Sequence, residues 1–178
     1  SNRCAVTDSE DVIDDCYIEI SFGYGSPRDL QTYKFGAIKH CIGEEILQLI
    51  ANTKCSCINS RVTYRGFSIC VVMASWNEEG KVGQGVHAVP KDIVDTVLVV
   101  NNGSIDLTEK EARDAGATVI NHPENLGAGG GYRTGWVFAK EKNFDLVVEL
   151  AGDNQDDPHD ISKAVDKLID EELDYVQG

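Results

Sequence analysis

Two residues of this sequence, Asp153 and Gln155, carry the side-chain oxygens that Mg²⁺ and Mn²⁺ prefer as ligands. They lie in a polar run, residues 151–158, that directly follows a predicted strand at residues 145–150. Oxygen ligands at the end of a buried strand are placed to hold a divalent cation against a diphosphate. Asp157 is better explained as the cap of the next helix, because carboxylates are favoured at the positive end of a helix. We therefore predict a Mg²⁺ or Mn²⁺ site formed by Asp153 and Gln155.

Two further polar loops follow apolar runs. Residues 75–79, SWNEE, come after the run 69–74, and residues 101–106, NNGSID, come after the run 97–100. Short β-branched runs without alternation are typical of parallel strands that are buried on both faces. The carboxyl ends of such strands share one edge of the sheet, where open α/β sheets bind their ligands. We therefore expect these two loops and residues 151–158 to form one site.

A glycine-rich segment, residues 127–133 (GAGGGYR), has some features of a dinucleotide-binding fingerprint. That fingerprint requires a glycine at position 132, where this chain has Tyr132, and a longer preceding strand. We therefore interpret the segment as the start of a helix. Its glycines either expose backbone N–H groups to a ligand or allow the helix to pack closely. Arg133 is within reach of a phosphate there, although an arginine on a helix is more often a solvated charge.

The order of apolar runs, helical patterns and turn residues predicts an α/β fold with a mostly parallel sheet. Candidate core residues on the sheet-facing sides of the helices are Trp136, Phe138 and Leu168. The strands are expected at residues 69–74, 94–100, 117–120, 145–150 and 174–176, and the helices at 78–88, 108–115, 127–142 and 158–170.

The N-terminal third is expected to be a small α+β module, residues 1–67, that precedes an α/β domain of residues 68–178. Residues 17–22 and 31–35 predict a β-hairpin, and residues 42–51 have helical spacing. The sixth cysteine, Cys70, lies in a predicted strand and is expected to be a core residue. The other five lie in the module, at Cys4, Cys16, Cys41, Cys55 and Cys57. Their spacing only faintly resembles a zinc ribbon, so a zinc site and a metal-free module both stay open.

The formal net charge of the chain is −14, and it is unevenly distributed. Residues 1–67 carry 9 acidic and 7 basic side chains, whereas residues 68–178 carry 21 and 9. Affinity for DNA or RNA depends on clustered Lys and Arg, so the acidic domain argues against a nucleic-acid partner. A phosphorylated ligand is still compatible if a divalent cation bridges it to an acidic pocket. Because no stretch has the length of a membrane span and no signal-peptide pattern is present, we expect a cytoplasmic protein.

Four motifs follow one another in the second part of the chain: CVVMASWNEE (70–79), VLVVNNGSID (97–106), HPENLGAGGGYRTG (122–135) and LAGDNQDDP (150–158). In this order and spacing they resemble family 2 glycosyltransferases of GT-A fold, with most similarity to the branch that transfers sugars to dolichol or polyprenol phosphate. The resemblance covers residues 68–178 and none of the N-terminal third. Any one of the motifs alone would be weak, but the four together are specific for the family.

The resemblance implies a nucleotide-binding role for residues at matching positions. Trp76 with Glu78 or Glu79 would enclose the nucleoside, and Asn101 and Asn102 stand where family members carry an acidic pair that reads the base. The remaining members of the implied nucleotide-binding set are Ser75, Ser104, Asn125, Gly127 and Arg133.

Two departures from the family pattern affect the expected chemistry. Ala151 replaces the first aspartate of the metal motif, so water or the phosphates of the donor would have to complete the coordination of the cation. The pair Asn101 and Asn102 presents amides in place of carboxylates. An amide offers a donor and an acceptor that complement uracil, whereas guanine is better matched by a carboxylate. We therefore expect a UDP-linked sugar more than a GDP-linked one.

The function implied by the resemblance is transfer of a sugar from a nucleotide-diphosphate sugar to a polyprenyl phosphate or saccharide acceptor, at the membrane surface in the complete protein. Family members continue beyond the position of Gly178 into the half that binds the acceptor, so no catalytic base is assigned here. One alternative is a non-catalytic nucleotide-sugar-binding module that kept the fold. The other is a protein-interaction module built around the N-terminal cysteines.

Overall fold

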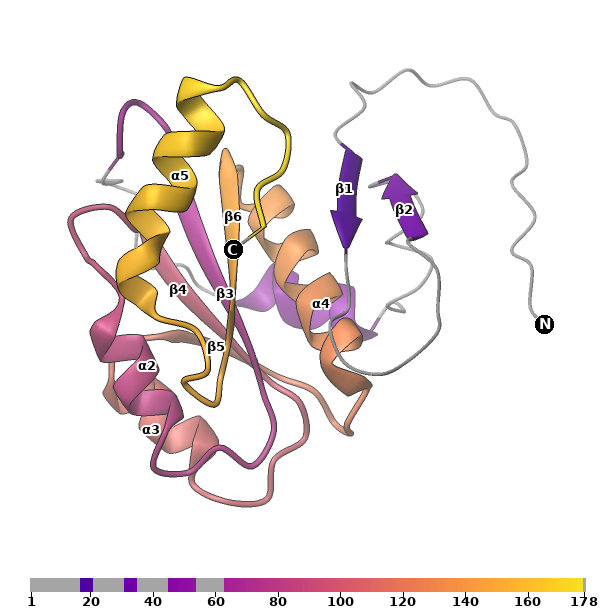
Figure 1. Cartoon of the computed structure of the whole chain (residues 1–178). Coiled ribbons are helices and arrows are strands. Elements are labelled where there is room, and N and C mark those ends of the chain that lie inside the picture. The colour runs from indigo at the N-terminus through magenta and orange to yellow at the C-terminus, as the bar shows by residue number, and fades with distance from the viewer. Residues whose placement is uncertain (1–16, 21–30, 35–44, 54–62, 178) are drawn as a thin grey trace, which may run out of the picture.

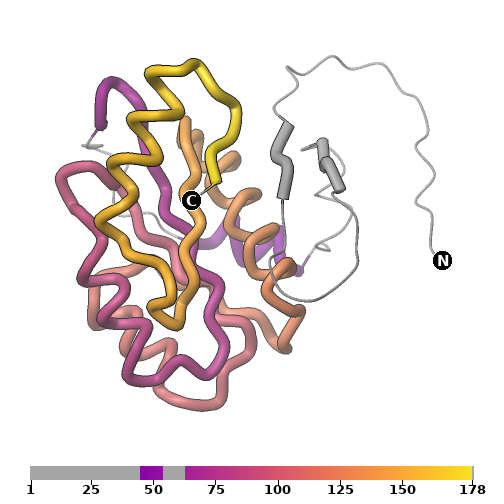
Figure 2. The backbone as a smooth tube through the Cα atoms, viewed as in Figure 1, coloured from indigo at the N-terminus to yellow at the C-terminus, as the bar shows by residue number. Residues whose placement is uncertain are grey.

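The computed structural model describes residues 17–20, 31–34, 45–53 and 63–177. Its centre is a parallel sheet of four strands in the order β5-β4-β3-β6. The backbone runs from β3 outward to β4 and β5, and then returns to the other side of β3 to form β6, as Figure 2 traces. The strands are β3 (Ile69–Ser75), β4 (Thr96–Asn101), β5 (Thr118–Asn121) and β6 (Leu146–Ala151).

Helices cover both faces of this sheet (Figure 1). One face packs against α2 (Val82–Ala88), α3 (Thr108–Asp114) and α5 (Ile161–Asp170). The other face packs against α4 (Gly127–Glu141) and against residues 45–52, which are helical. A parallel sheet needs such covers because its crossover connections leave both faces apolar. The α/β fold predicted from the sequence is thereby confirmed.

Strand β3 lies at the centre of both hydrophobic cores. Cys70 and Val72 belong to the core under α4, whereas Val71 and Met73 belong to the core under α2, α3 and α5. None of these four side chains is more than 1% exposed. Neighbouring residues of a strand point to opposite faces, so a strand without a polar position supplies both cores. Cys70 is a buried core residue, as its place in the strand predicted.

Helix α4 lies unusually close to β3 because glycines face the strand. A Cβ atom at Gly135 would stand 2.1 Å from Cγ1 of Val72, and one at Gly131 would stand 2.8 Å from Cβ of Ala74. Both distances are shorter than real carbon contacts, so these positions exclude any side chain. The glycine-rich helix start therefore serves close packing, one of the two uses that the sequence left open.

Four of the five predicted strands are confirmed, with their ends within two residues of the expected positions. The predicted strand at residues 174–176 is wrong, because the structure has no strand there. The N–H of Leu173 donates to the carbonyl of Leu168, which closes α5, and the chain then continues without pairing to β6. Leu168, predicted to be core, is only half-buried.

Two predicted helices begin later than expected. The helix expected from residue 78 starts at Val82, because Gly80 adopts φ +82°, outside the helical region. The N–H groups of Glu78 and Gly80 donate to side chains of Thr108 and Glu111, which fix this turn. The helix expected over residues 158–170 is divided into a 3₁₀ turn, η1 (Pro158–Asp160), and α5. None of the helices in the part of the chain that the structure describes is long and apolar enough to cross a membrane.

The N-terminal third is described only in part. Strands β1 (Tyr17–Ile20) and β2 (Gln31–Lys34) pair antiparallel, which confirms the predicted hairpin. Ile46 and Ile50, from the helical residues 45–52, are buried in the core under α4. The five cysteines of the predicted module lie outside the described residues. The division of the chain at residue 67 stays a prediction.

A carboxylate on the outer strand β6 reaches into the core under α4. The indole N–H of Trp136, a side chain only 1% exposed, donates to Oε1 of Glu149 at 2.5 Å. Glu149 as a whole residue is exposed, but this oxygen sits against buried groups. Burial raises the pKa of Glu149 to about 7, and the hydrogen bond from Trp136 offsets only part of that rise.

The raised pKa of Glu149 predicts a pH dependence of stability. A carboxyl group that binds its proton more tightly in the folded state stabilises the protein at low pH. That contribution is complete below the unfolded pKa near 4.5 and is lost as the pH rises through about 7. Between pH 5 and 8, Glu149→Gln should therefore flatten the stability curve by on the order of 1 kcal/mol, allowing for solvent screening. Urea unfolding of both proteins across this range measures it, and parallel curves would contradict it.

The close approach of α4 to β3 predicts an intolerance of Gly135 to substitution. Gly135→Ala should destabilise the protein by about 2 to 3 kcal/mol, because the methyl group overlaps Val72. Gly83→Ala in α2 is the matched control, since a Cβ there meets Glu111 at an ordinary 3.5 Å. The control should be neutral or stabilise by up to about 1 kcal/mol through helix propensity. Equal effects of the two variants in urea denaturation would count against the close packing.

Candidate functional site

The four parallel strands end at one edge of the sheet, with Ser75, Asn101, Asn121 and Ala151 as their last residues. The chain leaves β3 toward β4 on one side, whereas β6 lies on the other side. Ligands of open α/β sheets bind in the crevice at such a reversal of strand order. The loops predicted to form one site therefore do meet at one edge, and the reversal lies between β3 and β6.

The segment after β6 is held against the end of β3. A Cβ at Gly152 would stand 2.1 Å from Oγ of Ser75, so only glycine permits this approach. Asn154, at φ +66°, donates from its side-chain nitrogen to the carbonyl of Lys81 at 3.1 Å. Asp153 stands between these two anchored residues and is thereby fixed beside the loop that follows β3.

The two predicted metal ligands are close in space but form no complete cation site by themselves. Oδ1 of Asp153 accepts a hydrogen bond from the N–H of Gln155 at 3.1 Å. Position 151 has no carboxylate, because its residue is alanine. The N–H of Ala151 donates to Oδ2 of Asp156 at 2.7 Å. Within the described residues, no three side chains of the His, Cys, Asp and Glu types converge as a metal-binding group.

Asp157 is a helix cap, as the sequence predicted. Its Oδ1 accepts from the backbone N–H of His159 at 3.0 Å, at the start of η1. That backbone hydrogen bond, with a further one from the His159 ring, holds the pKa of Asp157 below its usual range.

The loops after β3 and β4 are joined by hydrogen bonds in both directions. The N–H of Asn77 donates to Oγ of Ser104 at 2.9 Å, while Oδ1 of Asn77 accepts from the N–H of Ile105 at 3.1 Å. Oε2 of Glu79 accepts from the N–H of Leu107 at 3.3 Å. Asn77 adopts φ +55°, a conformation that asparagine tolerates better than most residues. The two loops therefore form one connected unit.

Asp106 organises the second half of this unit. Its Oδ1 accepts from both the hydroxyl and the N–H of Thr108, and its Oδ2 accepts from the N–H of Glu79 at 3.1 Å. Burial would raise the pKa of Asp106, but these hydrogen bonds outweigh it and keep the pKa below the usual value. Asp106 and Thr108 were not assigned to the site from the sequence, although an aspartate two residues before a helical threonine is a recognisable cap signal.

Asn102 connects the loop after β4 to the loop after β5. Its side-chain nitrogen donates to Oδ1 of Asn125 and to the carbonyl of Gly127, at 3.0 and 2.9 Å. Its Oδ1 accepts from the N–H of Leu126 at 3.0 Å and from the ring of His122 at 2.8 Å. All the hydrogen-bonding positions of this buried amide are thereby occupied by the protein itself.

His122 is a buried partner of Asn102 that sequence reasoning did not assign to the site. Its Nδ1 faces Oδ1 of Asn102, and its Nε2 lies 2.9 Å from Oγ of Thr134. An amide oxygen only accepts, so Nδ1 carries the proton of a neutral ring. The hydroxyl of Thr134 lies between Nε2 and the carbonyl of Gly130, which is 3.1 Å away. Burial lowers the pKa of His122, in agreement with this neutral form. The ring therefore connects the loop after β5, through Thr134, to α4.

Asn101, the other predicted base-reading residue, is also buried but less fully engaged. Its side-chain nitrogen donates to Oδ1 of Asn121 at 2.9 Å, and its Oδ1 accepts from the N–H of Ser104 at 3.2 Å. An amide has two N–H groups and two lone pairs, so one of each has no partner within the described residues. A base-reading role for Asn101 and Asn102 stays a prediction.

The remaining predicted nucleotide-binding residues surround the same edge. Trp76 is 53% exposed, so its ring is accessible from solvent. Oε2 of Glu78 accepts from Nζ of Lys81 at 3.0 Å. Gly127, at φ +76°, begins α4, and its N–H donates to Oδ1 of Asn125. Arg133 is half-buried six residues further along the helix.

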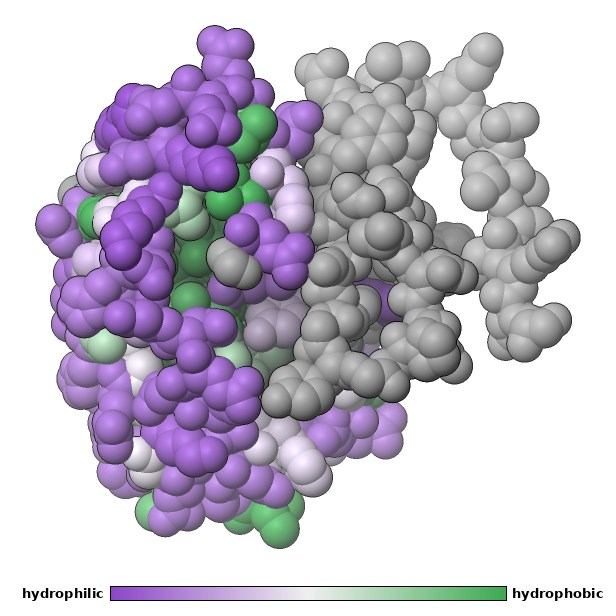
Figure 3. All heavy atoms as spheres, viewed as in Figure 1, coloured by the Kyte–Doolittle hydropathy of each residue, from purple (hydrophilic) through white to green (hydrophobic). Residues whose placement is uncertain are grey.

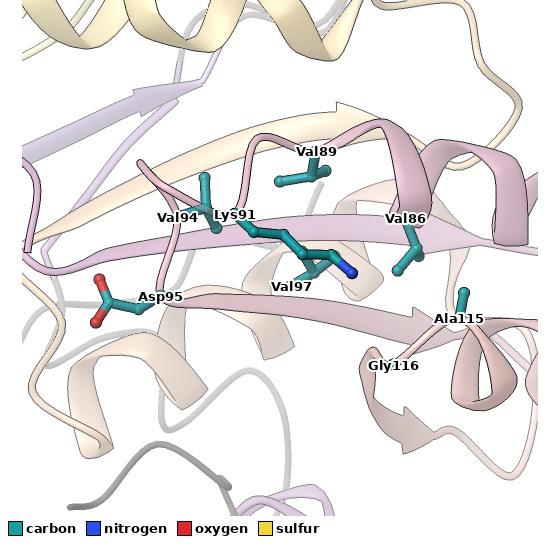
Figure 4. Close-up of a pocket in the computed structure, with 8 residues that line it drawn as sticks. All are labelled: Val86, Val89, Lys91, Val94, Asp95, Val97, Ala115 and Gly116. Atoms are coloured by element: carbon teal, nitrogen blue, oxygen red, sulfur yellow. The ribbon is translucent and has the colours of Figure 1, made fainter. Parts of the chain in front are cut away.

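A hollow of about 250 Å³ lies away from this edge, between α2, α3 and β4 (Figure 4). Asp95 and Val94 precede β4 at its amino end, so the hollow is near the opposite edge of the sheet. Apolar side chains form most of its wall, and Lys91 extends across it. None of the residues predicted to bind nucleotide or metal contributes to it.

The complete engagement of the Asn102 amide predicts that its nitrogen is indispensable. Asn102→Asp should destabilise the protein by about 2 to 4 kcal/mol, because a carboxylate cannot donate to Asn125 and Gly127 and is buried there without a cation. The matched control Asn52→Asp, at an exposed position, should change stability by less than about 1 kcal/mol. Urea denaturation at pH 7 compares them, and a neutral Asn102→Asp would refute the proposed network.

Comparison with known proteins places this edge in a family. The model of "Glycosyl transferase family 2" matches residues 70–178. An uncharacterised protein of Methanocaldococcus jannaschii is 31% identical over 110 residues, which are 62% of this chain and 45% of that protein. The UDP-N-acetylglucosamine–dolichyl-phosphate N-acetylglucosaminyltransferase of Methanococcus voltae is 28% identical over 127 residues, which are 62% of this chain and 51% of that protein. The chain thus spans about half the length of these two relatives.

Among solved structures, the glucosyl-3-phosphoglycerate synthase of Mycobacterium tuberculosis in complex with UDP superposes with a TM-score of 0.50 and 26% identity, over 59% of this chain and 41% of that one. The same enzyme has also been solved with Mn²⁺, UDP and glucosyl-3-phosphoglycerate, with a TM-score of 0.49, 26% identity and coverage of 58% and 40%. The sheet order and the residues matched by the family model agree. The chain belongs to glycosyl transferase family 2.

Proposed function

We propose that this chain is the donor-binding part of a glycosyltransferase, which binds a UDP-linked sugar together with Mg²⁺ or Mn²⁺. The observation that carries the proposal is the reversal of strand order between β3 and β6, where Gly152 brings Asp153 against the end of β3 at Ser75. The complete protein would transfer the sugar to a polyprenyl phosphate or to a saccharide. In that displacement the bond from the anomeric carbon to the diphosphate breaks as the bond to the acceptor oxygen forms.

Asp153 and Gln155 fit a cation that keeps several water or phosphate ligands. Asp153 is partly exposed, and its Oδ2 has no partner within the described residues. One carboxylate and one amide oxygen are few for a dedicated cage, but Mg²⁺ is often held by one or two protein ligands and the phosphates of its substrate. When bound, the cation would offset the charge of the departing diphosphate.

Trp76 and Asn101 are the residues we propose for the nucleoside. Trp76 is exposed on the loop that Asn77 and Ser104 fix in place, so its ring is available to a base without any rearrangement of the core. Asn101 retains one donor and one acceptor, which match the N3–H and O4 groups of uracil. The name of the Methanococcus voltae relative and the UDP complex of the mycobacterial enzyme support a uridine nucleotide.

The nature of the acceptor decides whether a general base is needed. A phosphate acceptor is already ionised and attacks unaided, whereas a sugar hydroxyl must lose a proton to a positioned base. At the carboxyl edge of the sheet, here called the donor edge, three aspartates follow β6, and each already has a role. Asp153 is assigned as a ligand, Asp156 accepts from the N–H of Ala151, and Asp157 caps η1. A lipid phosphate acceptor is therefore the simpler proposal, supported by the dolichyl phosphate in the name of the Methanococcus voltae relative.

A specific observation favours a second candidate, a module that binds nucleotide sugar without turnover. Position 151 has no carboxylate, and its N–H group is occupied by Asp156. The two candidates share donor binding and differ in whether the complete protein transfers sugar.

Donor binding predicts a metal-dependent change of tryptophan fluorescence when UDP is added. Trp76 is exposed and Trp136 is buried, so the change should come from Trp76 and disappear in Trp76→Phe. Asp153→Ala should weaken UDP binding in Mn²⁺ by about tenfold or more. Asp157→Ala, a matched control whose carboxylate caps η1, should bind UDP as the unsubstituted chain does.

Titration calorimetry with UDP and GDP tests the choice of base. UDP should bind more tightly than GDP in Mn²⁺, and the reverse order would contradict the uridine assignment. Absence of binding to either nucleotide, with or without Mn²⁺, would contradict donor binding altogether. A parallel assay of sugar transfer by the complete protein separates the catalytic candidate from the non-catalytic one.

A further inference from the structure

The large hydrophobic side chains that remain exposed are concentrated at the donor edge. Among the described residues, six large hydrophobic residues are exposed, and four of them stand on loops at the carboxyl ends of the strands. Trp76 is one of the four and is assigned to the nucleoside. The other three define an apolar rim: Ile105, Leu107 and Leu126, with exposures of 94%, 51% and 42%. Single exposed leucines need no explanation, but a cluster beside a binding site does.

The three side chains of the apolar rim belong to loops that contact each other. A Cβ at Gly103 would stand 2.8 Å from the backbone of Glu124, which places the loop after β4 against the loop after β5. The N–H of Leu126 donates to Asn102 of the other loop at 3.0 Å. Ile105 and Leu107 are two positions apart on the same loop. Hydrophobic residues also appear at the lower end of the space-filling view, where these loops turn in Figure 1 (Figure 3).

The loop that carries the apolar rim is held rigidly, so its exposure is a fixed property of the fold. The N–H groups of Ile105 and Leu107 donate to side chains of Asn77 and Glu79, and that of Thr108 donates to Asp106. An exposure of 94% means that Ile105 projects from the surface instead of lining a groove.

The geometry points to a lipid bilayer as the partner of this apolar rim, so that the donor edge works at a membrane surface. A bilayer requires that inserted backbone groups find their hydrogen bonds within the protein, and the N–H groups of Ser104, Ile105, Leu107 and Thr108 do so. Two carboxylates of these loops, Asp106 and Glu79, accept hydrogen bonds from neighbouring loop N–H groups, whereas Glu124, two residues before Leu126, is exposed. Projecting Ile and Leu side chains are of the apolar type that inserts at a membrane interface.

The charge of the domain specifies the kind of bilayer. Residues 68–178 carry 21 acidic and 9 basic side chains, so an anionic surface repels the domain at low salt. Insertion must therefore be driven by apolar burial, and neutral lipid is preferred. The inference rests on the proposed function in one respect: a bilayer-facing donor edge selects a lipid-linked phosphate over a free saccharide as acceptor.

Vesicle co-sedimentation of the whole chain tests this inference. The chain should bind phosphatidylcholine vesicles, and it should bind vesicles containing phosphatidylserine less at low salt, with added salt reducing the difference. Ile105→Ser combined with Leu107→Ser should lower the partition coefficient by about tenfold or more, because two apolar side chains no longer insert. Neither side chain packs in the core, so circular dichroism should show an unchanged fold.

Phe67→Ser is the matched control. Phe67 is 37% exposed just before β3, at the opposite edge of the sheet, and its substitution should leave vesicle binding unchanged. Failure of the unsubstituted chain to bind either vesicle, undiminished binding by the double variant, or an equal loss with Phe67→Ser would overturn the inference. Light scattering that shows a dimer abolished by the double variant would assign the rim to a second copy of the chain, and would also overturn it.

The UDP titration separates this inference from the proposed function. The double variant should bind UDP and Mn²⁺ as the unsubstituted chain does, because Ile105 and Leu107 are outside the proposed donor site. Vesicle binding without UDP binding would contradict the donor site alone. UDP binding without vesicle binding would contradict the membrane role of the apolar rim alone.

Discussion

The burial of β3 on both faces is the constraint on which the rest of this structure depends. A strand that is apolar on both sides must lie in the middle of a sheet, and helices must cover each face. Val72 faces α4 and Val71 faces the opposite layer, so the strand has no position for a polar group until Ser75. Function is thereby confined to the ends of the strands. The closeness of α4, which Gly135 permits, brings the glycine-rich start of that helix to the same edge.

The donor edge is stabilised mainly by hydrogen bonds between side chains and the backbone of neighbouring loops. The backbone hydrogen bonds between β3 and β4 end at Ser75 and Asn101. Beyond these residues the N–H groups of the loops need other partners. Asn77, Asp106 and Asn102 supply these partners, each from a different position in the two loops. In this chain much of the polarity of the edge holds the loops together instead of facing a ligand.

Hydrophobic pattern and turn chemistry were sufficient to predict the strands, most helices and the edge at which the site forms. Those signals are local, and β3 to β6 follow them closely. The prediction of a strand at residues 174–176 was wrong, because the apolar or aromatic side chains of Tyr175 and Val176 do not show whether a strand partner exists. It also placed the start of α2 too early, because the hydrogen bonds that capture Glu78 and Gly80 come from residues about thirty positions away.

The sequence predicted most of the residues that lie at the site, but it did not predict what each of them contacts. Sequence alone put Asn102 among the residues that read a base, whereas its amide is surrounded by protein partners. It left out His122, because a histidine before a proline carries no signal of burial. Such assignments depend on contacts between β4, β5 and α4 that only the three-dimensional arrangement defines.

The position of β6 also has a consequence for how the protein folds. β3, β4 and β5 are joined by short crossovers and are able to associate in chain order, whereas β6 pairs with β3 across a long intervening segment, as the pair Ile69 and Leu146 shows. Contacts of large sequence separation form late, because the loop between them must be closed before any contact is gained. We therefore expect β3, β4, β5 and their two helices to collapse first and β6 to dock last. The crevice between β3 and β6 would then be the final part of the molecule to take shape, and in a ribosome-bound nascent chain it would be absent until α4 and β6 had both emerged.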